Sequence, residues 1–398
     1  MPLLDRAAQL KQEVSLWRRH LHSKPELLYD VHETAAFVEQ KLREFGCDEV
    51  VTGIGRTGVV GVIKGKKGAG QAIGLRADMD ALPLTETGTP EWVSQNPGKA
   101  HSCGHDGHTS MLLGAAKILC ETRDFYGEVI VIFQPAEEGG AGGLAMVKDG
   151  MMERFNIVEV YGMHNMPGIP VGELAVCKGP IMAATDEFTI TINGKGGHAA
   201  QPHRNIDPIV IGSQLVTALQ SIVSRGSNPL DSLVISVTKF NAGEAYNIIP
   251  EKAVLAGTVR SLTKHNRAFA EQRMRAHCEA FGLLNNIKID LDFKNNYPVT
   301  FNHSGQTEIA ANVADKVSIN GPITREVEPM MGGEDFSYML EARPGCYIFL
   351  GNGESANLHH PAYDFNDDAL PYGMSYWVEL AQYRLKDAQL APAEKIAA

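Results

Sequence analysis

The chain has 398 residues, of which 44% are hydrophobic and 21% charged, an ordinary globular composition with enough length for two domains. The formal net charge is -11 and the one basic cluster is KGKKG at 64–68, so a nucleic-acid partner is not expected. No apolar run is long enough to span a membrane, the opening residues do not resemble a signal segment, and no CxxC pair occurs, so we expect a cytoplasmic protein with reduced cysteines.

The first part of the chain alternates helical and strand patterns. Apolar residues at helical spacing predict a helix over 4–22, and a second helix over 32–46 ends with Gly46 in the C-cap position. A further helix is expected over 109–123. Short runs rich in Val and Ile predict strands at 58–63, 72–76, 128–133 and 157–163. This alternation favours an α/β fold with a central, mostly parallel sheet.

The pattern changes after about residue 185, where alternating strands and long helices follow one another. Strands are predicted at 186–194, 232–240, 252–262 and 287–293, with helices over 206–225 and 265–281. The order β-α-β-β-α-β is that of a ferredoxin-like unit. We therefore expect a catalytic domain formed by 1–184 and 296–398, with an inserted domain over 185–295.

Four polar clusters fall where a binding site is expected. RADMD (76–80), FQPAEEGG (133–140) and YGMHN (161–165) each end a predicted strand, and HSCGHDGH (101–108) comes directly before a helix. Open α/β sheets bind their ligands beyond the carboxyl ends of the strands. The four clusters are therefore predicted to face one crevice.

The donors in these clusters are typical of a hydrolytic site with two metal ions. Cys103 and His105 lie two residues apart in a glycine-containing turn. Glu137 and Glu138 are adjacent, so one carboxylate can bind a metal while the other stays free as a base. The predicted ligand set is Cys103, His105, Glu138, His164 and His360.

Neighbouring residues fit more than one role. Asp78 is interpreted as support for a ligand and Asp80 as structural. Asp106 is either a helix N-cap or support for a ligand, and His108 either orients a ligand or is solvated. Spacing alone leaves open the roles of His101 and of His359 beside His360.

The sharpest alternative is a thiol hydrolase in which Cys103 is the nucleophile, His105 the base and Asp106 the orienting group. Residues so close in a turn rarely adopt the geometry of a nucleophile and its base. This alternative also leaves the other predicted ligands without a role.

Segments along almost the whole chain resemble the M20 metallopeptidase family. The resemblance is closest to its amidohydrolase branch of hippurate hydrolases, N-acyl-amino-acid amidohydrolases and auxin–amino-acid conjugate hydrolases. The matching segments are RRHLHSKPEL, GLRADMDALP, HSCGHDGHTSMLLGAA, FQPAEEGGAGG, GMHNMPGIPVG, GKGGHAAQPHRNIDP, NIIPEKAVLAGTVR, MGGEDFSYM and LHHPAYDFND. The resemblance implies that the inserted domain is a lid that also joins subunits into a homodimer or homotetramer.

The resemblance also implies roles for the metal-site residues. Cys103 would bridge two divalent metal ions per subunit, and Glu137 would be the general base. The remaining ligands would form two pairs, His105 with His164 and Glu138 with His360. Many members of the family have a histidine where this chain has Arg76 and an aspartate where it has Cys103. A thiolate bridge suits zinc best, and related enzymes also use manganese, cobalt or nickel.

Residues of the lid would act on the substrate. By the same resemblance, His198 and Asn247 would stabilise the oxyanion, and Arg260 would bind the substrate carboxylate. Gly333, in MGGEDFSYM, would line the substrate site. The implied reaction is hydrolysis of the amide bond of an N-acyl or N-aroyl amino acid such as hippurate, which releases a carboxylic acid and a free amino acid.

Other specificities of the family stay open, namely N-acetyldiaminopimelate deacetylase, dipeptidase or carboxypeptidase, and auxin-conjugate hydrolase. A non-catalytic binding protein on the same fold is a further alternative. Such a protein would have lost ligands, whereas this chain has the whole set.

Overall fold

The structure is a computed structural model that describes residues 4–389, and it divides into two compact units. The larger unit contains the chain up to Ile181, Phe301–Glu328 and the chain from Asp335, and the smaller one contains Met182–Thr300 and Pro329–Glu334. The sequence placed the two boundaries at 184–185 and 295–296. No helix within residues 4–389 has the length and apolar character that crossing a membrane requires.

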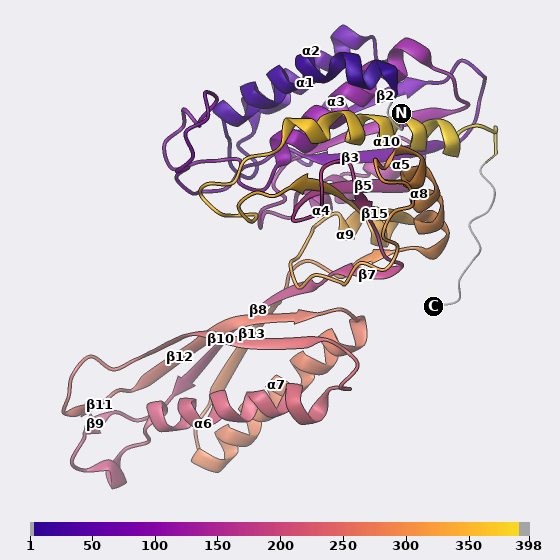
Figure 1. The fold of residues 1–398 in the computed structure, drawn as a ribbon. Helices are drawn as coiled ribbons and strands as arrows, with labels where there is room; N and C mark the ends of the chain where they lie inside the picture. The colour runs from indigo at the N-terminus through magenta and orange to yellow at the C-terminus, as the bar shows by residue number, and fades with distance from the viewer. Residues whose placement is uncertain (1–3, 390–398) are drawn as a thin grey trace. The chain divides into compact units, whose positions relative to one another are not determined.

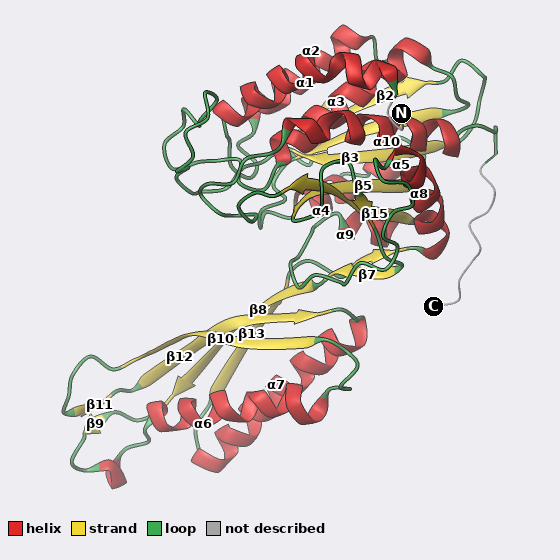
Figure 2. Cartoon of the chain, in the orientation of Figure 1, coloured by secondary structure: helices red, strands yellow, loops and turns green. Residues whose placement is uncertain are grey.

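The larger unit is built on a seven-stranded sheet (Figures 1 and 2). In sheet order its strands are β1 (Glu49–Ile54), β2 (Gly58–Lys64), β4 (Glu128–Gln134), β3 (Ala72–Asp78), β5 (Ile157–Pro167), β15 (Gly345–Gly353) and β6 (Leu174–Ala175). The four strands from β4 to β15 are parallel, whereas β1, β2 and β6 pair antiparallel with their neighbours. The predicted mostly parallel sheet is therefore confirmed. A separate ladder pairs β7 (Gly179–Met182) with β14 (Thr300–Asn302).

Helices cover both faces of this sheet (Figure 1). On one side lie α1 (Asp5–Ser23), α2 (His32–Phe45), α3 (His105–Thr122), α8 (Ser304–Val317) and α10 (Leu370–Arg384). On the other lie α4 (Gly142–Lys148), α5 (Met151–Arg154) and α9 (Ser337–Ala342). A 3-10 turn at Asp367–Ala369 leads into α10. As predicted, α2 ends at Gly46, whose left-handed φ of 81° suits glycine.

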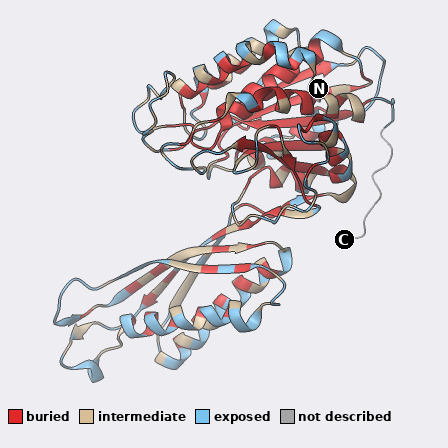
Figure 3. Cartoon of the chain, in the orientation of Figure 1, coloured by how far each residue is buried: buried red, intermediate tan, exposed pale blue. Residues whose placement is uncertain are grey.

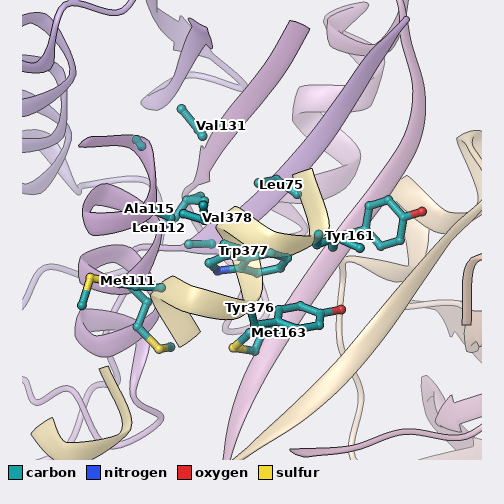
Figure 4. Packing of buried hydrophobic residues seen from close by; sticks show 14 of the residues in the cluster. Leu75, Met111, Leu112, Ala115, Val131, Tyr161, Met163, Tyr376, Trp377 and Val378 are labelled. Atoms are coloured by element: carbon teal, nitrogen blue, oxygen red, sulfur yellow. The ribbon is translucent and has the colours of Figure 1, made fainter. Parts of the chain in front are cut away.

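The core of the larger unit lies between α3 and the sheet. Figure 4 shows side chains of α3, of α10 and of the strands gathered in one cluster. The residues labelled there are Leu75, Met111, Leu112, Ala115, Val131, Tyr161, Met163, Tyr376, Trp377 and Val378. Because α3 is buried around nearly its whole circumference (Figure 3), its first turn is held at a fixed place above the sheet.

The start of α3 differs from the prediction. The helix begins at His105, not at 109, because Gly104 takes the N-cap position with a left-handed φ of 93°. Asp106 therefore lies inside the first turn and is not an N-cap. The segment 105–108, which the sequence placed directly before or at the start of the helix, is helical and buried.

The smaller unit has the β-α-β-β-α-β order predicted from the sequence. Its elements are β8 (Ala184–Asn193), α6 (Pro208–Ser221), β10 (Leu233–Ala242), β12 (Lys252–Ser261), α7 (Lys264–Asn285) and β13 (Ile289–Asn295). The sheet order β10-β12-β8-β13 is antiparallel throughout. Two short strands, β9 (Gly197–His198) and β11 (Ile248–Ile249), pair with each other. A 3-10 turn at Pro202–Arg204 precedes α6, and a π-helical turn at Ile222–Gly226 follows it.

Candidate metal centre

Polar side chains meet beyond the carboxyl ends of three parallel strands, as the sequence predicted. Asp78 is the last residue of β3, the pair Glu137 and Glu138 follows β4, and His164 lies near the end of β5. The first turn of α3 adds His105 at the same edge of the sheet. The strand order places β3 between β4 and β5, so these clusters become neighbours.

A first group of donors consists of Cys103, His105 and His164. Their ligand atoms all lie within 4.8 Å of one another, and all three residues are buried. The Cys103 Sγ and the His164 Nε2 are 3.4 Å apart. Thiolate and imidazole are the donors that zinc prefers. The structure therefore brings together three of the five ligands predicted from the sequence.

A second group shares one member with the first. It consists of Cys103, Glu138 and His359, again with ligand atoms within 4.8 Å of one another. The Nε2 of His359 is 3.3 Å from an oxygen of Glu138. Cys103 thus belongs to both groups.

The histidine of this second group differs from the one expected. The sequence pointed to His360, but the group contains the neighbouring His359. Both side chains are exposed, and the Nδ1 of His360 accepts the N–H of Ala362 at 3.1 Å. The neighbouring His359 takes a left-handed φ of 63°, and its own N–H donates to the Ser102 carbonyl at 2.7 Å. This backbone bond fixes the loop beside α3 and directs His359 toward Glu138.

The carboxylate of Asp80 holds the adjacent glutamates in place. It accepts the backbone N–H of Glu137 at 2.8 Å and that of Glu138 at 3.1 Å. The residue before them, Ala136, has a left-handed φ of 55°, a conformation that costs energy in a non-glycine residue. Asp80, interpreted from the sequence as structural, therefore fixes the turn from which both carboxylates project.

Hydrogen bonds at the far ring nitrogens orient the two histidines of the first group. His105 Nδ1 lies 2.7 Å from the Asp80 carbonyl, and His164 Nδ1 lies 2.6 Å from the Asn165 carbonyl. An imidazole that donates through Nδ1 carries its lone pair on Nε2, the tautomer that a metal ligand needs. Within residues 4–389, the buried Nε2 of His105 has no hydrogen-bond partner.

Asp78 and His108 lie behind these donors. Asp78 accepts from His108 Nδ1 at 2.6 Å and from the guanidinium of Arg76 at 2.7 Å. The other nitrogen of His108 accepts the N–H of Asn165 at 3.0 Å. With both ring nitrogens engaged, His108 supports the site and does not itself offer a donor to a metal.

The charges of the site fit a cation. Burial, together with Glu138 and Glu137, raises the pKa of the Cys103 thiol well above its usual range. Burial by itself would lower the pKa of His105, but Asp78 and Asp80 outweigh it and raise this pKa to about 10. The thiol is therefore neutral and the imidazole positively charged, which partly balances the negative charge of the surrounding carboxylates. A bound divalent ion would displace both protons. The His105 Nε2, which has no hydrogen-bond partner among residues 4–389, and the set of sulfur, nitrogen and carboxylate donors fit such an ion.

The residues predicted to bind the substrate all lie in the smaller unit, where they form two separate groups. His198 in β9 pairs with Ile248, and the next N–H, of Ala199, donates to the Asn247 carbonyl at 3.0 Å, so His198 and Asn247 lie together and exposed. The second group, Arg260 and Gly333, lies next to Thr185. Arg260 is its cross-strand partner, and a Cβ added to Gly333 would lie 2.2 Å from its Cγ2.

Comparisons with known proteins give relatives along nearly the whole chain. Residues 74–383 match the peptidase family M20/M25/M40. The chain is 41% identical to the hippurate hydrolase of Campylobacter jejuni over 97% of its length and 100% of the relative. It is also 41% identical to the N-acetyl-L-cysteine deacetylase of Bacillus subtilis, covering 93% of this chain and 88% of that one.

A solved structure shares the fold as well as the sequence pattern. The Bacillus subtilis YXEP protein, a dinuclear metal binding peptidase of the M20 family, superposes with a TM-score of 0.84 at 32% identity, covering 95% of this chain and 99% of that one. Together with the matched family and the two relatives, this similarity confirms the resemblance seen in the sequence motifs. The chain belongs to the peptidase family M20/M25/M40, in its amidohydrolase branch, and is a metal-dependent hydrolase of amide bonds.

Proposed function

We propose that this enzyme hydrolyses the amide bond of N-acyl or N-aroyl amino acids, with hippurate-like compounds as its first substrates. The observation that carries this proposal is the pair of donor groups that share Cys103. The 41% identity to a hippurate hydrolase over nearly the whole chain supports the aroyl substrate. The equal identity to an N-acetyl-L-cysteine deacetylase supports a small acyl group as the second candidate.

The two groups would hold two divalent ions per subunit. His105 and His164 with Cys103 would hold one ion, and Glu138 and His359 with the same thiolate would hold the other. Zinc suits this donor set best, with manganese, cobalt or nickel as the alternatives. Ions bound there would supply Lewis acidity, which would polarise the substrate carbonyl and lower the pKa of water toward ~7.

Glu137 is the general base of the proposed reaction. One of its carboxylate oxygens lies within 4.8 Å of a ring nitrogen of His105 and of a carboxylate oxygen of Glu138, so the carboxylate faces the donor groups. It takes a proton from the attacking water onto a carboxylate oxygen and then gives that proton to the nitrogen of the leaving amino acid. Asp80 keeps the carboxylate in this position through the backbone N–H of Glu137.

The smaller unit would supply the contacts to the rest of the substrate. In this proposal Arg260 binds the carboxylate of the amino acid, because a guanidinium matches a carboxylate in a bidentate way. Gly333 lines the same place next to Thr185. His198 and Asn247 stabilise the oxyanion, and the unit acts as a lid and as the contact surface of a homodimer or homotetramer.

The thiol mechanism is less well supported by the site. Reactive cysteines are exposed thiolates of low pKa, whereas Cys103 is 6% exposed and its thiol pKa is raised by burial and by neighbouring carboxylates. Its sulfur lies next to His164, not only next to the His105 that a local pair would use. A thiol mechanism would also leave Glu138 and His359 without a function.

A substrate panel tests the proposal. Enzyme stripped with a chelator is reloaded with zinc, manganese, cobalt or nickel and assayed with acetyl-, benzoyl- and indoleacetyl-amino acids. We expect no turnover by the stripped enzyme and recovery after reloading, with benzoylglycine among the best substrates. Activity that survives chelation but is destroyed by iodoacetamide would establish the thiol mechanism instead. Bound metal without turnover of any acyl-amino acid would support a non-catalytic protein.

A further inference from the structure

A buried arginine on α1 lies between two segments that each carry a donor. Arg18 is fully buried, and its Nη1 is 2.8 Å from Asp364 and 3.6 Å from Asp106. Its Nε donates to Asp367 at 2.7 Å. The guanidinium also lies 4.8 Å from the centre of the Trp92 ring. One side chain therefore contacts carboxylates from the start of α3 and from the loop after β15.

The contact on the α3 side is adjacent to a donor. Asp106 directly follows His105 in the first turn of the helix. Its second partner is His22, one helical turn after Arg18 on α1, whose Nδ1 is 2.8 Å from the same Asp106 oxygen. Two side chains of one helix face thus hold the turn that carries His105.

The contact on the loop side restrains the chain that carries His359. Asp364 and Asp367 follow this histidine after a few residues. Asp364 is held from a second direction by the indole N–H of Trp92 at 3.2 Å. The bonds to Arg18 therefore fix the end of a loop whose middle is fixed by the N–H of His359 on Ser102.

Such a buried ionic cluster is a poor way to gain stability. Desolvation of the ions offsets much of their attraction, and apolar side chains of similar volume are often equally or more stabilising. Buried ion pairs do, however, restrict the relative placement of the elements that carry them, and groups behind metal ligands commonly change metal affinity by about 10–100-fold. Arg18 occupies the place where this restriction acts on both donor groups.

We propose that Arg18 is a positioning residue of the metal centre, which sets the spacing between the segment of His105 and the segment of His359. This role rests on the proposed metal centre. Removal of the guanidinium would loosen both segments and weaken both donor groups. Removal of a contact on the loop side alone, at Asp364, would weaken only the group that contains His359.

Zinc titration of the stripped full-length chain tests the proposal. Arg18→Met is compared with Arg19→Met, whose arginine binds the other oxygen of Asp367 and stacks on Trp92 but is partly exposed. We expect Arg18→Met to lower zinc affinity about 10–100-fold in both binding steps and to reduce the rise in Tm that zinc produces. Arg19→Met should leave both affinities within about twofold of the wild type. An equal drop in Tm for metal-free and zinc-loaded Arg18→Met, with unchanged affinities, would overturn the proposal.

Asp364→Asn keeps the test decisive if Arg18→Met does not fold, because this side chain is 35% exposed and the substitution is isosteric. Weakening of one zinc step and not the other supports the role, and unchanged affinities overturn it. Arg18→Lys, which retains the charge but not the fork of donors, should recover only part of the affinity. A wild-type chain that binds no zinc would instead overturn the proposed metal centre itself.

Discussion

Replacement of each of two adjacent histidines by alanine gives the sharpest test of the proposed metal centre. The Nε2 of His359 is 3.3 Å from Glu138 and belongs to a group of three donors, whereas the Nδ1 of His360 accepts the N–H of Ala362. Loss of a residue that merely orients a ligand costs about 10–100-fold in metal affinity. His359→Ala removes a donor itself, so we expect a loss above ~100-fold, or more than ~2.7 kcal/mol, in one of two binding steps.

The control lies one residue away. His360→Ala removes one exposed hydrogen bond, worth about 1 kcal/mol of stability at most, and should leave both zinc affinities within about threefold of the wild type. Stripped proteins are titrated with zinc against a chromophoric chelator, and the number of binding steps and their affinities are compared. The reasoning fails if His360→Ala loses a step while His359→Ala binds zinc as the wild type does.

Three further outcomes are expected. Glu137→Gln should lower kcat by about 10²–10⁴-fold with bound metal unchanged, whereas Glu138→Ala should lose metal, as elemental analysis and steady-state kinetics would show. Arg260→Met should raise KM for benzoylglycine about 10–100-fold and hardly change it for the amide of that substrate, which has no carboxylate. Burial would lower the pKa of His22, but Asp106 and Glu86 raise it to about 9, so its ion pairs stabilise the fold fully below about pH 6.5 and lose this effect as pH rises through 9. The groups that face this ring are Asp106, Glu86, Arg18, Asp364 and His101. The difference in Tm between the wild type and His22→Gln should accordingly be largest at or below pH 6.5 and shrink toward pH 9, and a constant difference would contradict this.

The sequence predicted the fold well where local patterns carry the information. The long amphipathic helices and the strands rich in Val and Ile are set by side-chain periodicity, which a single sequence displays. The strand Glu49–Ile54 was not predicted, because it lies at the sheet edge, has one buried side chain and depends on its antiparallel partner β2. The early start of α3 depends on the left-handed Gly104 and on burial of polar side chains, neither of which periodicity reveals.

The candidate site likewise has residues that the sequence could place and residues that it could not. The carboxyl ends of parallel strands indicated that Cys103, His105 and His164 would meet, because that placement follows from topology. The choice between His359 and His360 depends on one backbone bond to Ser102, a contact between residues far apart in the chain. The hydrogen bonds from the backbone of Glu137 and Glu138 to Asp80 also join residues far apart in the sequence. Only the position of Asp80 at a strand end could have indicated them.

The order of segments in the larger unit affects how the chain folds as it leaves the ribosome. Of the donors, those up to His164 are synthesised before the whole inserted unit, and His359 comes only near the end. β15 lies between β5 and β6 in the finished sheet, so the nascent chain keeps an open, largely apolar edge along β5 until that late strand is made. The smaller unit, almost continuous in sequence, can fold meanwhile. A chain interrupted before Gly345 would therefore keep an exposed, aggregation-prone strand edge and would lack the donor His359.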